Sequence, residues 1–236
     1  MTHWQYGILF LILSAAAFVG AAITRLTGVC ATTVWLAVSC FWTAAAFFFH
    51  CPEMVLGKRQ NRICFLPFAI VNFPFLFAYW LVWMFRHLIL RHEPVHEIPG
   101  TGISVSCWPA FHVSLENYDF VVDVSSETPK LYRTQTTPTT NESQNQSSLP
   151  KYICLPNLDG VPLDRLELSE EIRRGMRILV HCAQGRGRSA VMACLLLVKL
   201  EYARTGEEAF QTLKSSRPKV HVSRYQMEQI RKFKEK

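Results

Sequence analysis

Three long stretches without a charged side chain dominate the first 92 residues of this chain. They span residues 7–24, 26–50 and 63–85 and consist mainly of aliphatic and aromatic residues. A helix that crosses a bilayer needs about 20 predominantly apolar residues, and each stretch is close to that length. Trp and Tyr side chains lie near their ends, as interfacial anchors do. The sequence therefore predicts a membrane anchor of about three transmembrane helices in residues 1–92.

The first and third stretches each have an alternative interpretation. A cleaved signal peptide normally begins with basic residues, and neither Lys nor Arg precedes residue 7. This favours a spanning helix over a cleaved peptide. Pro67 and Pro74 are expected to kink the third helix, which a helical bundle tolerates. That stretch could also be a re-entrant or interfacial segment, so the range of expected spans is two to four.

Charge is distributed unevenly along the 236 residues, whose net charge is +7. Residues 1–92 contain six basic residues and one acidic residue, whereas residues 93–236 contain nineteen and seventeen. The basic groups therefore form no continuous patch on a polar domain, and a nucleic acid is not an expected partner. With three spans, basic residues lie on both sides of the membrane, and the positive-inside rule does not fix the orientation.

From residue 93 onward the composition changes to that of a soluble α/β domain. Short apolar runs predict strands at 105–108, 120–124, 152–155 and 177–180. Amphipathic or apolar periodicity predicts helices at 166–176 and 190–202. Strands that alternate with helices favour a mainly parallel sheet flanked by helices. The expected fold class is thus α/β for residues 93–236, preceded by the helical membrane segment.

Residues 128–150 are rich in Thr, Ser, Asn, Gln and Pro and have almost no apolar side chains to bury. This composition predicts a flexible polar loop. The loop contains Asn141 and Asn145, each in an N-glycosylation acceptor tripeptide. Such tripeptides occur often by chance, so their use here is as a test of membrane topology.

Residues 181–189, His-Cys-Ala-Gln-Gly-Arg-Gly-Arg-Ser, lie between a predicted strand and a predicted helix. The glycines allow the backbone to curl so that successive N–H groups point inward and form an anion-binding nest. The helix that follows adds the partial positive charge of its N-terminus. Arg188 can hold two phosphate oxygens with its planar guanidinium. This arrangement predicts a phosphate site.

Cys182 opens this loop. A thiol in a field of N–H groups and an arginine is expected to have a lowered pKa and to be a thiolate at neutral pH. A thiolate beneath a bound phosphate is a nucleophile in line for phosphoryl transfer. Ser189 can donate a hydrogen bond to the sulfur and stabilise it as a leaving group. Phosphate binding without turnover is the alternative.

The pattern His-Cys-(x)5-Arg-Ser resembles the signature of the cysteine-dependent protein tyrosine phosphatase superfamily, in particular its dual-specificity branch. The resemblance covers about residues 93–236. It implies that Cys182 is the nucleophile, that Arg188 holds the phosphate and that Ser189 is the hydroxyl partner. It also implies that His181 orients the loop. The implied phosphate-binding cradle consists of the backbone amides of Ala183, Gln184, Gly185, Arg186, Gly187 and Arg188.

The reaction also needs a general acid that protonates the leaving alkoxide, and the family supplies an Asp from a loop upstream of the Cys. Asp159 is the preferred candidate, because it lies in a turn 23 residues before Cys182. Asp164 remains an alternative, since this interval is shorter than in many relatives. Asp159 could otherwise only stabilise the turn beside Gly160.

No cofactor is expected, and the spacing of His and Cys residues matches no metal site. The eight cysteines are scattered and form no disulfide framework. Because a thiolate enzyme needs reducing conditions, the domain is predicted to face the cytosol. The chain is thus predicted to be a multi-pass integral membrane protein, in a membrane that the sequence does not identify.

The sequence leaves the substrate open. Phosphotyrosine, phosphoserine or phosphothreonine in a protein is preferred. A lipid phosphate, either a phosphoinositide or phosphatidylglycerophosphate, is the alternative, because Arg186 resembles a basic loop residue of lipid phosphatases in the superfamily. Gln184 departs from many relatives and makes that match incomplete. A non-catalytic phosphate-binding membrane adaptor is a further alternative, although the Cys, the Arg and a candidate acid are all present. Oligomeric state is left open.

Overall fold

The computed structural model describes residues 3–23, 27–58, 66–89, 95–109, 113–130, 149–163 and 168–233. It divides into two compact units, Met1–His92 and Glu93–Lys236. Asp164, Asn141, Asn145 and most of the predicted loop at 128–150 lie outside the described residues.

Helices are the only regular secondary structure among the described residues of the N-terminal unit. Its helices are α1 (His3–Ile23), α2 (Thr27–Phe48), α3 (Glu53–Leu56), α4 (Leu66–Val71) and α5 (Phe73–Ile89). Helices α1 and α2 pack along their length: Tyr6 stacks on Phe47, and the Ser14 hydroxyl donates to the Ala37 carbonyl over 2.8 Å. Two of the helices, over His3–Ile23 and Cys30–Phe48, are long and apolar enough to cross a membrane.

The third predicted span is not one long helix. It is divided at Asn72 into α4 and the 17-residue α5. The Asn72 side chain donates to the carbonyls of Met54 and Val55, over 2.8 and 2.9 Å, so the break is held by the end of α3. Pro74 lies in the first turn of α5, where its missing N–H is tolerated. The sequence predicts one helix with kinks at its prolines, whereas the structure has two separate helices with the break at Asn72.

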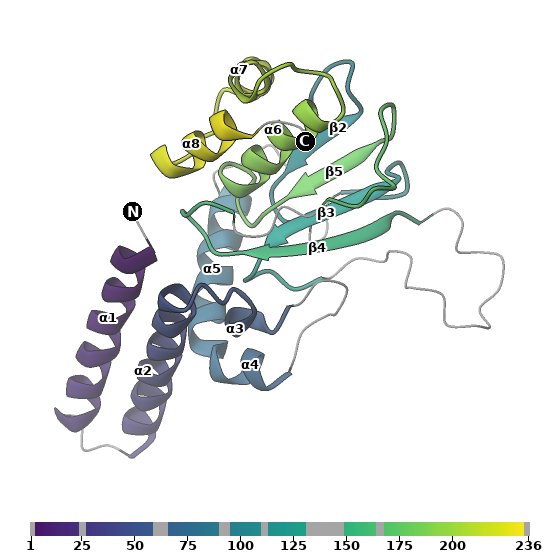
Figure 1. The fold of residues 1–236 in the computed structure, drawn as a ribbon. Coiled ribbons are helices and arrows are strands. Elements are labelled where there is room, and N and C mark those ends of the chain that lie inside the picture. The colour runs from purple at the N-terminus through teal and green to yellow at the C-terminus, as the bar shows by residue number, and fades with distance from the viewer. Residues whose placement is uncertain are drawn as a thin grey trace. The chain divides into compact units, whose positions relative to one another are not determined.

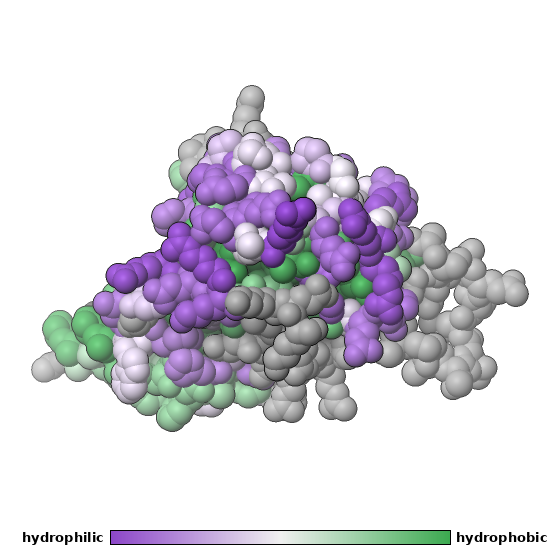
Figure 2. Space-filling view, turned by 45° about the horizontal axis from the view of Figure 1, so that its top comes forward, coloured by the Kyte–Doolittle hydropathy of each residue, from purple (hydrophilic) through white to green (hydrophobic). Residues whose placement is uncertain are grey.

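Exposed apolar side chains are concentrated in this unit. Among the described residues, every large hydrophobic side chain that is exposed belongs to it, apart from Tyr225. Figure 2 shows the unevenness on one face of the molecule, where hydrophobic residues gather in one part and hydrophilic residues cover most of the remaining coloured surface. Soluble proteins rarely expose so large an apolar surface.

The C-terminal unit is an α/β domain built on a five-stranded sheet (Figure 1). Its strands are β1 (Val95–Glu97), β2 (Ile103–Ser106), β3 (Phe120–Ser125), β4 (Lys151–Asn157) and β5 (Ile178–His181). They lie in the order β1-β2-β5-β3-β4, and only β1 is antiparallel to its neighbour. The mainly parallel sheet is therefore confirmed, with β5 at its centre.

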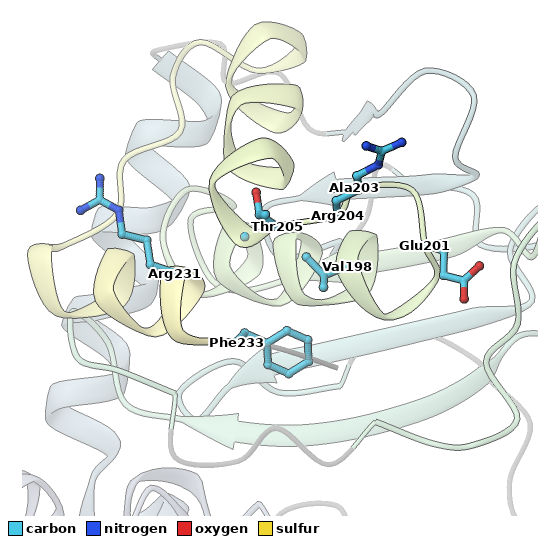
Figure 3. Close-up of a pocket in the computed structure, with 8 residues that line it drawn as sticks. Val198, Glu201, Ala203, Arg204, Thr205, Arg231 and Phe233 are labelled. Carbon is cyan, nitrogen blue, oxygen red and sulfur yellow. The ribbon is translucent and has the colours of Figure 1, made fainter. Parts of the chain in front are cut away.

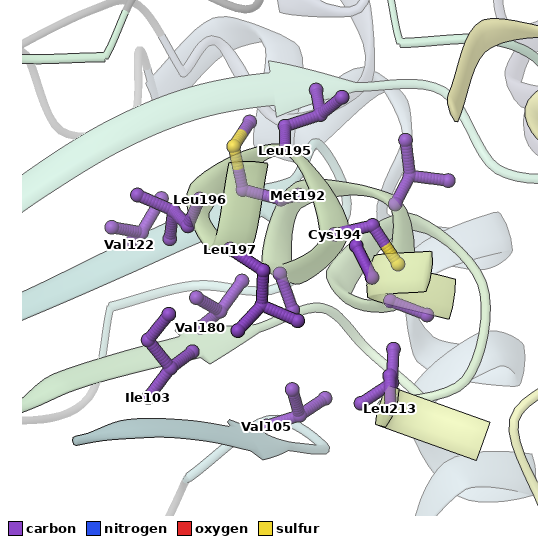
Figure 4. Packing of buried hydrophobic residues seen from close by; sticks show 14 of the residues in the cluster. Ile103, Val105, Val122, Val180, Met192, Cys194, Leu195, Leu196, Leu197 and Leu213 are labelled. Atoms are coloured by element: carbon purple, nitrogen blue, oxygen red, sulfur yellow. The ribbon is translucent and has the colours of Figure 1, made fainter. Parts of the chain in front are cut away.

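Three helices cover one face of this sheet: α6 (Arg188–Lys199), α7 (Gly206–Ser216) and α8 (Arg224–Lys232). Helix α6 is buried along almost its whole length and packs on alternate residues of β2, β3 and β5 (Figure 4). Val105, Val122 and Val180 contribute from the strands, and Met192, Leu196 and Leu197 are among the helix residues of this core. The core thus fixes the helix that begins at Arg188.

One predicted helix is wrong. Residues 168–176 form two successive turns and contain no helix. The Ser169 carbonyl accepts from the Ile172 N–H, and the Arg173 carbonyl accepts from the Met176 N–H. Gly175 then adopts a φ of 86°, which ends any helical continuation. Ile172 is buried in this non-helical segment, so its apolar side chain contributes to an amphipathic pattern without a helix. The sequence analysis predicted neither β1, α7 nor α8.

Candidate active site

The carboxyl ends of the parallel strands meet at one edge of the sheet. Strand β5 ends at His181 and is followed by Cys182, and β3 is followed within two residues by Glu127. Strand β4 ends at Asn157, two residues before Asp159. Ligand sites of parallel sheets lie at this edge. Side chains distant in the sequence are therefore brought together by the topology.

Residues 182–188, here called the phosphate loop, connect β5 to α6. Gly185 has a φ of 66°, and a Cβ atom there would lie 2.5 Å from the backbone of Ser106 and of Cys107 at the end of β2. Only glycine satisfies both the left-handed backbone and the close approach. The Arg186 carbonyl accepts from the His221 N–H over 3.2 Å. The loop is thus supported from two sides.

The Cys182 sulfur lies within this loop and is buried. It accepts a hydrogen bond from the Gly185 N–H over 3.2 Å, and its Sγ is 3.3 Å from the Ser189 hydroxyl oxygen. Cys182 is 2% exposed and Ser189 is fully buried. The sulfur thus has one N–H of the loop as a donor and the Ser189 hydroxyl group as a neighbour.

Arg188 is the first residue of α6 and its side chain is almost fully buried. Its Nη1 donates to Oε2 of Glu127 over 2.8 Å and to the Asn157 carbonyl over 2.7 Å, and its Nη2 donates to Oε1 of Glu127. Burial alone would lower the pKa of Arg188, but the carboxylates of Glu127 and Asp159 outweigh burial and raise that pKa well above its ordinary value. The guanidinium is therefore permanently charged.

Asp159 approaches the same guanidinium from the open side. Its Oδ1 lies 3.2 Å from Nε of Arg188, and its side chain is 51% exposed. This contact lacks hydrogen-bond geometry, because Nε has no hydrogen-bond partner among the described residues. A buried donor without a partner costs free energy unless a ligand satisfies it. An oxyanion in the phosphate loop would supply that acceptor.

His181 precedes the nucleophile candidate and is completely buried. Its Nδ1 lies 3.8 Å from Oδ1 of Asp123, directly opposite it in the register of β3 and β5. Asp123 accepts from the Ser125 N–H over 3.0 Å and from the Tyr152 hydroxyl over 2.6 Å. These bonds fix the end of β3, where the pairing with β4 is shifted and the chain turns toward Glu127.

Of the predicted site residues, the structure brings together Cys182, Ser189, Arg188 and Asp159. Glu127, whose carboxylate makes a two-point ion pair with Arg188, was not predicted from the sequence. The signal that could have found it is an acidic residue that follows a buried strand at the edge where the other site residues lie. Its neighbours Ser126 and Thr128 instead indicated only a polar loop.

A cavity of about 450 Å³ elsewhere in the unit is not this site (Figure 3). It is lined by Val198, Thr205 and Arg231 among others, and therefore lies at the opposite end of α6 from the phosphate loop. Arg231 is already paired with Glu207 over 2.7 Å. Among the described residues no group of three His, Cys, Asp or Glu side chains could hold a metal ion.

Comparison with known proteins agrees with the motif. Residues 166–236 match the family model described as "Dual specificity phosphatase, catalytic domain". No curated protein matches the chain. The match and the parallel sheet show a dual-specificity-phosphatase-like domain, and the domain type supports a cysteine-based phosphatase.

Three of the solved structures that resemble part of this chain have low identity to it and TM-scores below 0.5. Human DUSP28 is 17% identical over 59% of this chain and 94% of its own, with a TM-score of 0.41. Tk-PTP in its active form is 21% identical over 58% and 92%, with a TM-score of 0.40. PTPMT1 in complex with PI(5)P is 17% identical over 59% and 93%, with a TM-score of 0.39.

Proposed function

We propose that this protein is a membrane-anchored phosphatase that hydrolyses phosphate monoesters through a cysteinyl-phosphate intermediate. The observation that carries the proposal is the Cys182 sulfur, which accepts the Gly185 N–H beside the buried, charged guanidinium of Arg188. Phosphoryl transfer requires a nucleophile next to an anion site, and the position of this sulfur beside a charged guanidinium supports the proposal.

In the first step, the Cys182 thiolate attacks phosphorus and the bond to the leaving oxygen breaks. Arg188 holds the phosphoryl oxygens, with its Nε as one donor, while the amides of residues 183–188 bind the others. Asp159 protonates the leaving alkoxide, and its exposed carboxyl group can take up that proton from solvent. His181 supports the loop from its buried position.

In the second step, water attacks the cysteinyl phosphate and releases inorganic phosphate. Ser189 stabilises the departing thiolate through the contact between its hydroxyl group and the sulfur, 3.3 Å in the free protein. Asp159, now ionised, accepts a proton from the attacking water, which restores the starting state.

For the substrate, we propose phosphotyrosine, phosphoserine or phosphothreonine in proteins. A lipid phosphate is the alternative, because Arg186 adds a second cation to the phosphate loop. The test is phosphate release by the full-length protein in detergent from a panel of phosphopeptides and from vesicles containing phosphoinositides or phosphatidylglycerophosphate. Faster turnover of the vesicles at equal phosphate concentration would reject the protein-substrate proposal.

For the anchor, we propose that α1 and α2 span a membrane. Each is long enough to cross the bilayer core, which is about 30 Å thick, and large apolar side chains on both helices are exposed. The core helix of a soluble protein would bury those side chains. Retention in the membrane pellet after alkaline extraction would support the proposal, and release into the supernatant would reject it.

We further propose that the C-terminal unit faces the cytosol. The acceptor sites at Asn141 and Asn145 provide the test. A glycosidase-sensitive shift in mass of the protein expressed in eukaryotic cells would place the domain in the lumen and overturn this orientation.

A further inference from the structure

The segment that contains Asp159 is bound at its downstream end to the C-terminal helix. We call residues 158–163 the acid segment. The Gln229 side chain of α8 makes two hydrogen bonds to one residue of it: its Oε1 accepts from the Leu163 N–H over 2.8 Å, and its Nε2 donates to the Leu163 carbonyl over 2.6 Å. One side chain thus satisfies both backbone groups of Leu163.

A second glutamine, one helical turn earlier, binds the same segment. Gln226 donates through Nε2 to the Val161 carbonyl over 3.0 Å. Its Oε1 accepts from the Ser223 N–H over 3.0 Å, which completes the capping box at the start of α8. Both ends of the Gln226 amide are therefore used, and the side chain is 2% exposed.

The chain just before α8 contacts the phosphate loop as well. The His221 N–H donates to the Arg186 carbonyl, and the space above Gly187 faces the His221 carbonyl and the Gln226 side chain. Residues 221–229 therefore bind both the loop with the nucleophile candidate and the segment with the acid candidate. These contacts of residues 221–229 help to fix the distance between the phosphate loop and the acid segment.

The upstream end of the acid segment has its own anchor. The Asn157 carbonyl, just before the segment, accepts from Arg188 over 2.7 Å, and Leu158 is buried. Between this anchor and Val161 stand only Asp159 and Gly160, whose φ is 73°. A short turn between two fixed points has little freedom, so loss of one anchor would release Asp159.

We propose that Gln229, supported by Gln226, is a positioning residue that holds Asp159 where it can protonate the leaving group. The inference rests on the proposed phosphatase function and on Asp159 as its general acid. Neither glutamine touches the reacting atoms. Both act through the backbone of the acid segment.

A misplaced general acid has a signature that a structural defect does not reproduce. Protonation matters for a leaving group of high pKa and is dispensable for one of low pKa. Gln229→Met keeps length and helix propensity but removes both hydrogen bonds. Its kcat/KM, which reports the steps up to formation of the cysteinyl phosphate, should fall about 10-fold for phenyl phosphate and stay within about twofold of wild type for 2,4-dinitrophenyl phosphate. Activity on the second substrate also reports that the protein is folded.

Three further variants of the full-length chain make the test decisive. Asp159→Asn should show the same selectivity with a larger loss. Gln229→Glu, which keeps the acceptor for the Leu163 N–H and loses the donor, should fall between Gln229→Met and wild type. Glu228→Gln is the matched control, because Glu228 is the neighbour on α8 and forms a surface ion pair with Arg224 at 3.7 Å, with the charge of Arg231 also nearby. It should behave as wild type.

Each outcome decides the matter. Equal losses on both substrates for Gln229→Met, or no loss on either, would overturn the positioning role while the selective loss in Asp159→Asn leaves the proposed function intact. A wild-type protein without activity on either ester would remove the proposed function and this inference together. The selective loss in both variants would support the inference.

Discussion

Two carboxylates contact the same guanidinium, and they differ in burial and in the geometry of the contact. Glu127, at the buried base of the site, has a side chain that is 5% exposed and binds Arg188 at two points. Asp159, at the open rim, is 51% exposed and makes a single contact without hydrogen-bond geometry. Glu127 holds the buried guanidinium in a fixed position, whereas Asp159 is open to solvent on a short turn that is held at both ends.

This contrast separates two requirements of phosphoryl transfer. Electrostatic stabilisation needs a charge that does not reorganise, which burial and two-point pairing provide. Acid catalysis needs a group in exchange with solvent protons, which burial would prevent. If the two carboxylates have these separate roles, substitution of Glu127 should mainly lower stability and substitution of Asp159 should mainly lower turnover.

Substitution of the nucleophile is expected to have the largest effect. Cys182→Ser should reduce phosphate release to the background rate, because a hydroxyl group at this position is not ionised at neutral pH. Cys107→Ala is the control: Cys107 follows the strand next to β5, and burial raises the pKa of its thiol to about 11, so it is neutral and should be dispensable. Wild-type turnover by Cys182→Ser would reject the mechanism.

At the rim, Asp159→Asn should lower kcat by about 10²–10⁴-fold for an alkyl or phenyl ester. Because the side chain is half exposed, the melting temperature and the affinity for inorganic phosphate should change little. Steady-state kinetics and thermal unfolding measure both quantities. A large loss of stability instead of rate would show that the rim is structural and would erase the contrast with the base.

At the base, Glu127→Gln should lower the free energy of unfolding by about 3–5 kcal/mol, because it leaves the buried charge of Arg188 without its counterion. Saturating inorganic phosphate should raise the melting temperature of this variant more than that of wild type, since the anion replaces part of the lost charge. Denaturant titration with and without phosphate provides the measurement. A variant as stable as wild type would contradict the fixed base.

The smallest effect is expected at Arg186. Arg186→Ala keeps the backbone carbonyl that accepts the bond from the His221 N–H. For phosphopeptides KM should rise about fivefold or less, the value of a solvent-screened charge contact of a half-buried side chain. A much larger rise for anionic lipid vesicles than for peptides would move the substrate proposal toward lipids.

The sequence predicted the elements that local pattern determines. The central strands were found because each is a short apolar run, and the phosphate loop was found because its glycines, Cys182 and Arg188 are adjacent in the chain. These features need no knowledge of the remaining fold. The prediction of a helix at 166–176 was wrong, because residues 168–176 form turns. A turn can bury a single apolar residue such as Ile172, as a helix would.

What the sequence could not predict depends on tertiary contact. Glu127 and Arg188 are 61 residues apart in the chain. They form an ion pair because β3 and β5 are neighbouring strands of the sheet. The contacts of Gln229 with Leu163 join positions 66 residues apart. Neither residue belongs to a local motif, and both appear as ordinary polar residues in their own segments.

The two-point ion pair also constrains how this chain could change over generations. Loss of Cys182 or Asp159 would remove the proposed nucleophile or acid and would leave the buried ion pair between Glu127 and Arg188 in place. Loss of Arg188 would strand the Glu127 carboxylate in the interior. A related protein that binds phosphate without catalysis would therefore be expected to retain Arg188 and Glu127 and to carry a substitution first at Cys182.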